Sequence, residues 1–192
     1  MCDTGYTPRD LVADLRDLKA RGVPEGEMLE EVSGLVKRLV MMKHNWLRPS
    51  MQVPSGDITQ ASIYQLHEEP DHSLAVFVVT WPPGEETRPH EHRTWAVVGG
   101  LDGWETQHLW KRLDDGSKSG HAELVRERSE RIDSSTIVTL GSNAIHSVQN
   151  DSGALSVTLH IYGMHPDYTG RLGFDPERHT SSPYNPNAMA VR

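Results

Sequence analysis

The 192 residues suffice for one domain with a buried core, and 36% hydrophobic and 24% charged residues are ordinary values for a globular protein. The formal net charge of −8 argues against a nucleic-acid-binding protein, which needs basic side chains to neutralise phosphates, and weakly against an anionic membrane surface as a partner. No apolar stretch approaches the roughly 20 residues that span a bilayer.

The cysteine and histidine counts narrow the chemistry. Cys2 is the single cysteine, so an internal disulfide and a zinc site built from cysteines are both excluded. The first ten residues lack the basic start and apolar centre of a secretion signal. We therefore expect a cytoplasmic protein. Eleven histidines are the notable count, because imidazole is the commonest protein metal ligand.

Two helices are expected in the first fifty residues. Thr7 is a helix-capping residue, Pro8 follows at the first helical position, and apolar residues recur at helical spacing until Gly22. A second amphipathic helix is expected from about Glu25 to Met42. The apolar stripes of both helices predict packing on a sheet rather than chemistry.

After Pro54 short β-rich runs alternate with turns rich in glycine, proline and asparagine. The expected strands cover residues 62–66, 74–81, 94–98, 105–110, 136–140 and 155–161. Many short strands at regular spacing predict a sandwich or a barrel. We expect one mainly β domain over residues 1–192, made of a helical segment (1–50), a barrel (51–175) and an irregular tail (176–192).

Three histidines form the first chemical signal. In His90-Glu91-His92 the two imidazoles project from one face of a strand, about 7 Å apart along the chain, and can share a metal ion. Taken alone, this spacing is equally typical of two surface histidines. His146 lies in a turn-to-strand setting further along the chain and adds a third imidazole.

The spacing of these histidines and of nearby glycines resembles the paired motifs of the cupin superfamily. That resemblance implies a double-stranded β-helix, or jelly-roll barrel, in which both motifs converge on one metal ion, with the N-terminal helices packed outside. The motif residues are Gly84…His90-x-His92…Gly103 and His146-x-x-x-Asn150.

One departure from the usual cupin pattern concerns a glutamate four or five residues after the second histidine. This chain has Ala96 and Val97 there. The implied ligand set is therefore three neutral imidazoles, His90, His92 and His146, with no carboxylate. Such a set leaves an open side for substrate and dioxygen, and leaves the ion's full positive charge available to deprotonate a thiol.

A three-histidine cupin without the glutamate resembles the thiol dioxygenases. Residues 90–99 and 159–163 are similar to the bacterial branch, which includes 3-mercaptopropionate dioxygenase and its cysteine dioxygenase relatives, and the similarity extends over residues 60 to 175. It implies one Fe(II) per chain, a small thiol and dioxygen as substrates, and a sulfinate as product. A homo-oligomer is left open, and neither nucleic acid nor a membrane is an expected partner.

Thr158, His160 and Tyr162 alternate on one expected strand, so all three can face the cavity. In the thiol dioxygenases the corresponding trio is a serine–histidine–tyrosine relay beside the iron, which implies catalytic roles for these residues. Threonine replaces the serine here and keeps its hydroxyl. The alternative is a buried strand whose polar side chains have found hydrogen-bond partners.

Substrate contacts are expected from Arg171, Tyr64 and Gln65. Arg171 resembles the arginine of the bacterial branch that contacts the substrate carboxylate, although a solvated loop arginine is the alternative. Tyr64 and Gln65 fall near a second family position, which is an arginine in cysteine dioxygenases. The absence of arginine there disfavours cysteine and favours a thiol acid similar to 3-mercaptopropionate. Arg88 and His165 are further residues expected near the cavity.

Two other functions remain open from the sequence. The first is a cupin enzyme that uses another metal for isomerisation or another oxygenation, since imidazole suits several metals. The second is a non-catalytic cupin that binds a small ligand.

Overall fold

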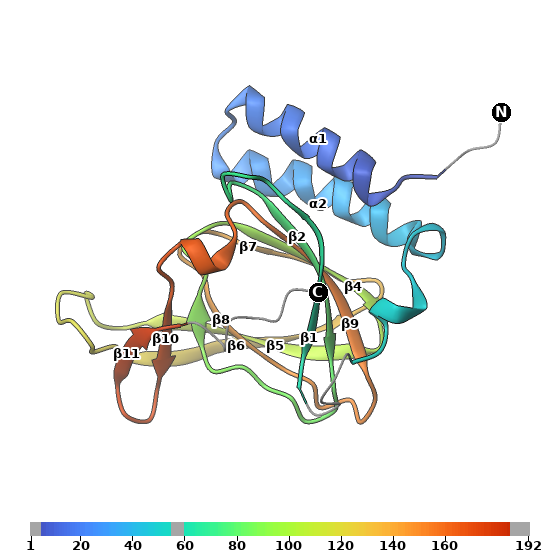
Figure 1. Cartoon of the computed structure of the whole chain (residues 1–192). Coiled ribbons are helices and arrows are strands. Elements are labelled where there is room, and N and C mark those ends of the chain that lie inside the picture. Colours follow the sequence, from blue (N-terminus) through green and yellow to red (C-terminus); the bar gives the residue numbers. More distant parts are fainter. Residues whose placement is uncertain (1–4, 55–59, 185–192) are drawn as a thin grey trace.

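The computed structural model describes residues 5–54 and 60–184 (Figure 1). Cys2 lies outside these residues. The helices are α1 (Pro8–Arg21) and α2 (Glu25–Met41), with short 3-10 helices at Lys43–Asn45, Pro49–Met51 and Pro166–Tyr168. The strands are β1 (Ser62–Glu68), β2 (Ala75–Trp81), β3 (His90–Glu91), β4 (Ala96–Asp102), β5 (Trp104–Arg112), β6 (Leu124–Asp133), β7 (Ile137–Leu140), β8 (Ile145–Gln149), β9 (Ser156–Tyr162), β10 (Leu172–Asp175) and β11 (Thr180–Pro183).

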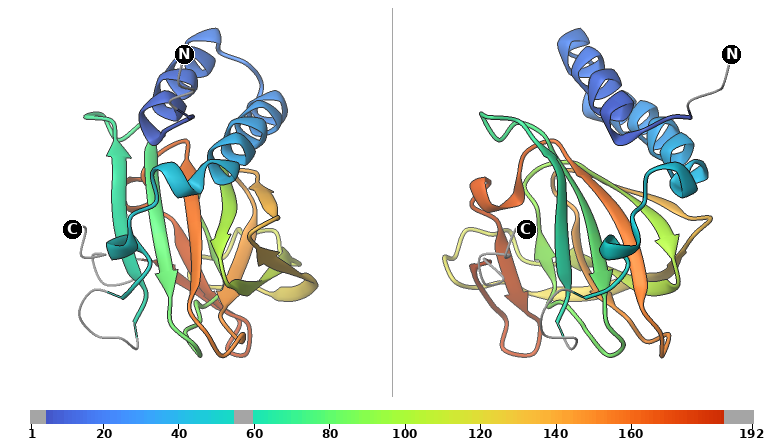
Figure 2. Two further views of the ribbon diagram at one scale, coloured as in Figure 1. Left: turned by 90° about the vertical axis from the view of Figure 1, so that its right-hand side faces the viewer. Right: turned by 45° about the vertical axis from the view of Figure 1, so that its right-hand side comes forward.

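Two antiparallel sheets form a barrel (Figures 1 and 2). One sheet has the strand order β1-β2-β9-β4-β7, and the other has the order β11-β10-β3-β8-β5-β6. Apolar side chains from both sheets meet inside, among them Phe77, Val98 and Val148. The mainly β fold, a double-stranded β-helix, is therefore confirmed.

Both helices lie outside the barrel, on the outer face of the five-stranded sheet (Figure 2). Thr7 caps α1 as expected, since its side chain accepts from the backbone N–H of Asp10. The apolar side of the helices packs against the outward-facing residues of β2, β4 and β9, such as Val76 and Ile161. α2 lies close to β4 at Gly99, where an added Cβ would be only 2.9 Å from the side chain of Val36.

The structure also has strands outside the six expected ranges, namely β3, β6, β8, β10 and β11. β6 carries a run of charged residues, most of them exposed, because it is an edge strand of the six-stranded sheet. β8 is short and follows a turn directly, so it offers little alternating pattern. Within the described residues, neither helix has the length and apolar character that crossing a bilayer requires.

The expectation of an irregular tail over residues 176–192 is wrong for its first part. Thr180–Pro183 forms β11, which pairs with β10. The Asp175 carboxylate accepts from the backbone N–H groups of Glu177 and Arg178 and so stabilises the turn between the strands. A short edge strand also tolerates the proline at its end. The remaining expected tail, residues 185–192, lies outside the described residues.

Candidate metal centre and its surroundings

His90, His92 and His146 converge inside the barrel. β3 lies between β8 and β10, and His90 pairs directly with His146 of β8. His92 comes after the two-residue strand, and Arg93 next to it adopts a left-handed conformation with φ 56°. One ligand nitrogen from each histidine lies within 4.8 Å of the others, and all three residues are buried. The structure therefore brings together the three histidines expected from the sequence.

Two of the rings are oriented by acceptors on their outer nitrogens. Nδ1 of His90 lies 2.9 Å from the carbonyl oxygen of Arg88, and Nδ1 of His146 lies 3.0 Å from Oε1 of Gln107. The amide of Gln107 has a fixed direction, because its Nε2 donates to the Glu130 carboxylate at 2.8 Å. Both Nδ1 atoms therefore carry hydrogen, and both Nε2 atoms have a lone pair that could bind a metal ion. The Nε2 of His146 lies 3.3 Å from the Nε2 of His92.

Burial keeps the three imidazoles neutral. It lowers the pKa values of His90 and His92 well below the usual range, and the neighbouring His146 adds to this effect. Burial also lowers the pKa of His146 to about 3, with a further contribution from the charge of Arg171. Neutral imidazole is the form that binds a metal. Among the described residues the cluster includes no carboxylate, and Glu91 forms an ion pair with Arg93 instead. The donor set fits a divalent transition metal ion.

A chain of hydrogen bonds runs along the opposite sheet toward this cluster. The indole Nε1 of Trp81 donates to Oγ1 of Thr158 at 3.2 Å, and Oγ1 of Thr158 lies 2.9 Å from Nε2 of His160. Nδ1 of His160 lies 3.0 Å from the Tyr162 hydroxyl. The Tyr162 ring meets the His92 ring edge-on, with 4.9 Å between the centroids. The three strand residues expected from the sequence thus form one connected chain that ends beside the histidines.

Burial sets the protonation states of this chain. It lowers the pKa of His160 to about 3 and raises the pKa of the Tyr162 hydroxyl above its usual range. At neutral pH His160 is therefore a neutral imidazole with one N–H, and Tyr162 keeps its hydroxyl hydrogen. Trp81 was not expected from the sequence, because it reaches Thr158 across 77 residues.

Arg171 is buried beside the histidines rather than solvated. Only 4% of its side chain is exposed, and its Nη2 donates to Asp167 at 2.9 Å. Its Nε has no hydrogen-bond partner among the described residues. Tyr184, which the sequence did not indicate, contacts both His90 and Arg171. Its ring stacks on the His90 ring with 4.5 Å between the centroids, and the Arg171 Cζ lies 5.1 Å from the centroid of the Tyr184 ring.

The structure does not bring every expected residue to the cluster. Tyr64 packs on the helix side of β1, and its hydroxyl donates to the Val53 carbonyl oxygen. Gln65 alternates with it and shares the interior side of β1 with Ile63. Arg88 lies outside the cluster, because its guanidinium donates to Ser182 and Pro183 of β11.

His165 is buried near the cavity side of β2. Its ring meets the Phe77 ring edge-on at 5.2 Å, and Phe77 also contacts Tyr162. The expectation from the sequence that His165 lines the mouth of the pocket stays a prediction.

Glu105 is a second interior feature that the sequence did not indicate. Its side chain is fully buried, and the Ser156 hydroxyl donates to its Oε2 at 2.9 Å. Its Oε1 has no hydrogen-bond partner among the described residues. Burial raises the pKa of this carboxyl to about 8, so it is largely protonated at neutral pH.

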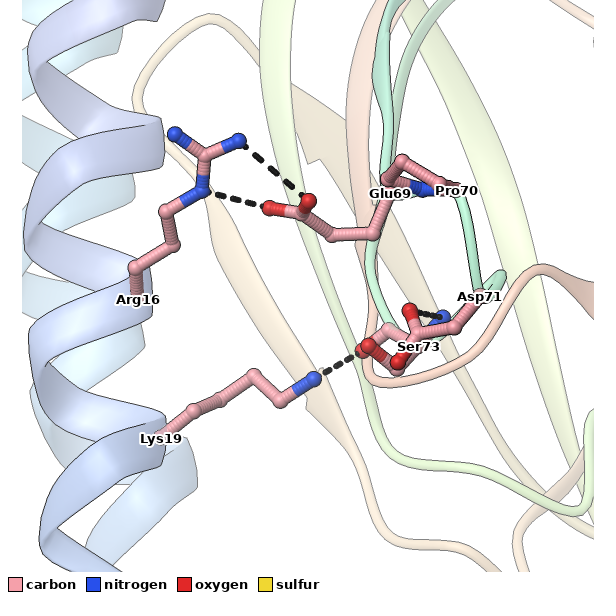
Figure 3. A pocket seen from close by; sticks show the side chains of 6 residues that line it. All are labelled: Arg16, Lys19, Glu69, Pro70, Asp71 and Ser73. Atoms are coloured by element: carbon pink, nitrogen blue, oxygen red, sulfur yellow. Dashed lines mark hydrogen bonds and ion pairs between the residues drawn. The ribbon is translucent and has the colours of Figure 1, made fainter.

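A surface pocket lies elsewhere, between α1 and the turn that joins β1 to β2 (Figure 3). Arg16 of α1 forms an ion pair with Glu69, and Lys19 donates to the Ser73 carbonyl oxygen. The two cations are therefore already engaged, and the contacts tether α1 to the barrel.

No protein-family model matches the chain. Solved structures with similar folds include an oxalate oxidase in complex with glycolate, at 14% identity and a TM-score of 0.46, where the match covers 62% of this chain and 58% of that one. A cupin with a double-stranded β-helix fold from Methanocaldococcus jannaschii has 15% identity and a TM-score of 0.43, with 59% and 89% covered. A DMSP lyase from Ruegeria pomeroyi has 18% identity and a TM-score of 0.46, with 68% and 60% covered. The match spans less than two thirds of the oxalate oxidase and of the lyase, and these likenesses concern the fold alone.

Proposed function

We propose that the protein is an Fe(II)-dependent thiol dioxygenase that converts a small thiol acid, similar to 3-mercaptopropionate, and dioxygen to the sulfinate. The observation that carries this proposal is a neutral cluster of three buried histidines, without a carboxylate, at the end of the Trp81–Thr158–His160–Tyr162 chain. The proposed location is the cytoplasm, where a free thiol stays reduced.

The reaction balances without a further reactant. A thiol loses four electrons on becoming a sulfinic acid, and one dioxygen molecule accepts four electrons while both its atoms join the sulfur. When bound, Fe(II) would hold the sulfur and dioxygen side by side and favour the thiolate form of the substrate. His90, His92 and His146 are the residues that would hold it.

Tyr162 is the proposed hydrogen-bond donor to the reacting oxygen atoms. Trp81 can only donate, so Thr158 accepts from it and can pass its own hydrogen to Nε2 of His160. Nδ1–H of His160 then donates to the Tyr162 oxygen. This arrangement leaves the phenol hydrogen directed at the site, where a positioned donor stabilises charge that develops during the reaction.

Arg171 is the proposed partner of the substrate carboxylate. Its guanidinium is buried next to the histidines and keeps one unpartnered N–H, so a carboxylate would supply the missing acceptor. Glu91 forms an ion pair with Arg93, and Asp167 forms one with Arg171. Neither carboxylate therefore presents an unpaired negative charge that would repel the carboxylate of the substrate.

The test is oxygen uptake by the Fe(II)-loaded protein with 3-mercaptopropionate, cysteine and cysteamine, using labelled dioxygen and mass analysis of the product. We expect both labelled atoms in one sulfinate and faster turnover of the thiol acid than of cysteine. His146→Ala should lose both bound iron and turnover. Incorporation of a single labelled atom, or a requirement for a 2-oxo acid, would contradict the proposal.

A further inference from the structure

Tyr184 contacts both of the groups that a thiol acid must reach. Its ring stacks on His90, with a centroid distance of 4.5 Å and an angle of 29°. The Arg171 Cζ is 5.1 Å from the same ring, and 8% of Tyr184 is exposed. The ring therefore contacts both one candidate metal-binding imidazole and the buried guanidinium.

The β10–β11 hairpin fixes this position. Leu172 pairs with Pro183, and the next pair is Arg171 with Tyr184, whose backbone N–H donates to the Arg171 carbonyl oxygen at 3.0 Å. Paired residues of an antiparallel ladder project from the same face, which explains why guanidinium and ring meet. Arg171 and Tyr184 are thus held as a unit.

Arg88 also packs on the ring. Its Cζ is 4.9 Å from the ring centroid, and its Nη2 donates to the Pro183 carbonyl oxygen at 3.1 Å. Gly173 makes room for it, since a Cβ there would come within 2.4 Å of the Arg88 Nε. Two guanidinium groups and one imidazole therefore contact the Tyr184 ring, which leaves it little freedom to move.

We propose that Tyr184 is a specificity-determining residue that sets the distance between the metal centre and Arg171, and thereby the length of thiol acid that the site accepts. The inference rests on the proposed function, because it takes the sulfur to lie at the histidines and the carboxylate at Arg171. A rigid ring packed against both anchors shapes the space that the substrate must occupy, and one methylene more or less in a shaped pocket changes selectivity about tenfold or more.

The experiment compares mercaptoacetate, 3-mercaptopropionate and 4-mercaptobutyrate, which differ by one methylene each. Their dissociation constants are measured from the absorption spectrum of the Co(II)-loaded protein, and kcat/KM is measured with the Fe(II)-loaded protein. Tyr184→Leu should reduce the discrimination between lengths at least about tenfold. Tyr184→Phe keeps the ring and should keep the order of preference, whereas the larger ring of Tyr184→Trp should shift preference toward the shortest acid.

Trp104→Leu is the matched control, because it also removes an aromatic ring that packs against an arginine, here Arg131 of β6. It should leave the length preference unchanged. A Tyr184→Leu protein that binds Co(II) normally and keeps the wild-type preference would overturn the inference, as would a wild-type protein that binds all three acids equally. Length-selective binding without any turnover would instead contradict the proposed function and leave the role of Tyr184 standing.

Discussion

Gln107 decides which nitrogen of His146 faces the histidine cluster. Its amide oxygen accepts from the buried imidazole and its amide nitrogen donates to Glu130 on the edge strand, although neither Gln107 nor Glu130 belongs to the ligand set. Partners of this kind orient a metal-binding histidine and increase its basicity. The cluster therefore depends on a residue that contributes no ligand atom.

Gln107→Leu should weaken metal binding about 10- to 100-fold while the three histidines remain. The leucine fills the same space but cannot hold the His146 ring in one tautomer. Competition of Co(II)-loaded protein with a chelator would measure the change. Gln149→Leu, a substitution on the strand of His146 itself, is the control and should bind Co(II) like the wild type; equal affinities of all three proteins would refute the role of Gln107.

Tyr162→Phe should keep a full complement of iron and lose about 10²-fold or more of the turnover rate. The hydroxyl contacts His160 and no metal-ligand atom, so its removal affects oxygen chemistry rather than metal binding. Oxygen uptake and iron analysis on the same samples separate the two effects. An unchanged rate would mean that the chain from Trp81 to Tyr162 only holds the barrel together.

Residues at regular spacing on one strand could be predicted from the sequence. Thr158, His160 and Tyr162 alternate, and the structure joins them by two hydrogen bonds. Gln107 and Tyr184 could not be predicted in this way, because each reaches the histidines through the pairing of strands far apart in sequence. Tyr64 was expected at the cavity, but the parity of β1 turns it toward the helices.

At the scale of elements, β3 shows why alternating sequence patterns predicted only some of the strands of the barrel. It has two residues, too few for an alternating pattern, and is held by its neighbours β8 and β10. β6 lacks an apolar face because it lies at an edge. The helices were predictable because their stripes are long and one begins at a recognisable cap.

The close contact between β4 and the end of β6 predicts a stability change. A Cβ at Gly100 would lie 1.9 Å from the carbonyl oxygen of Asp133, so the backbone itself must move. Gly100→Ala should lower the free energy of unfolding by about 1–3 kcal/mol in urea denaturation. Gly34→Ala, on α2 with no atom near its added Cβ, should raise it by about 0.5–1 kcal/mol. A Gly100→Ala protein as stable as the wild type would contradict this account of the contact.

At the scale of the whole molecule, Glu105 links stability to pH. Burial raises the pKa of its carboxyl from 4.5 to about 8, so between these values the folded protein keeps a proton that the unfolded chain releases. The contribution of this carboxyl to the free energy of unfolding is therefore fully present below pH 4.5. It is lost as pH rises toward 8, by up to about 1.4 kcal/mol per pH unit.

Glu105→Gln cannot ionise and still offers an oxygen to Ser156. Its stability relative to the wild type should therefore increase steadily as pH rises from 4.5 to 8, as measured by thermal unfolding of the two proteins in the same metal state. Glu127→Gln, which alters an exposed carboxyl of β6, should show no such trend. A difference between Glu105→Gln and wild type that is constant over this range would show that the carboxyl is already ionised inside the barrel.

The position of β3 between two later strands has a consequence for biosynthesis. His90 and His92 leave the ribosome early, yet the strands that hold them in place, β8 and β10, are translated more than fifty residues afterwards. Tyr184 emerges later still. A nascent chain therefore carries two of the three clustered histidines unrestrained for much of its synthesis, and the cluster closes only when the barrel does.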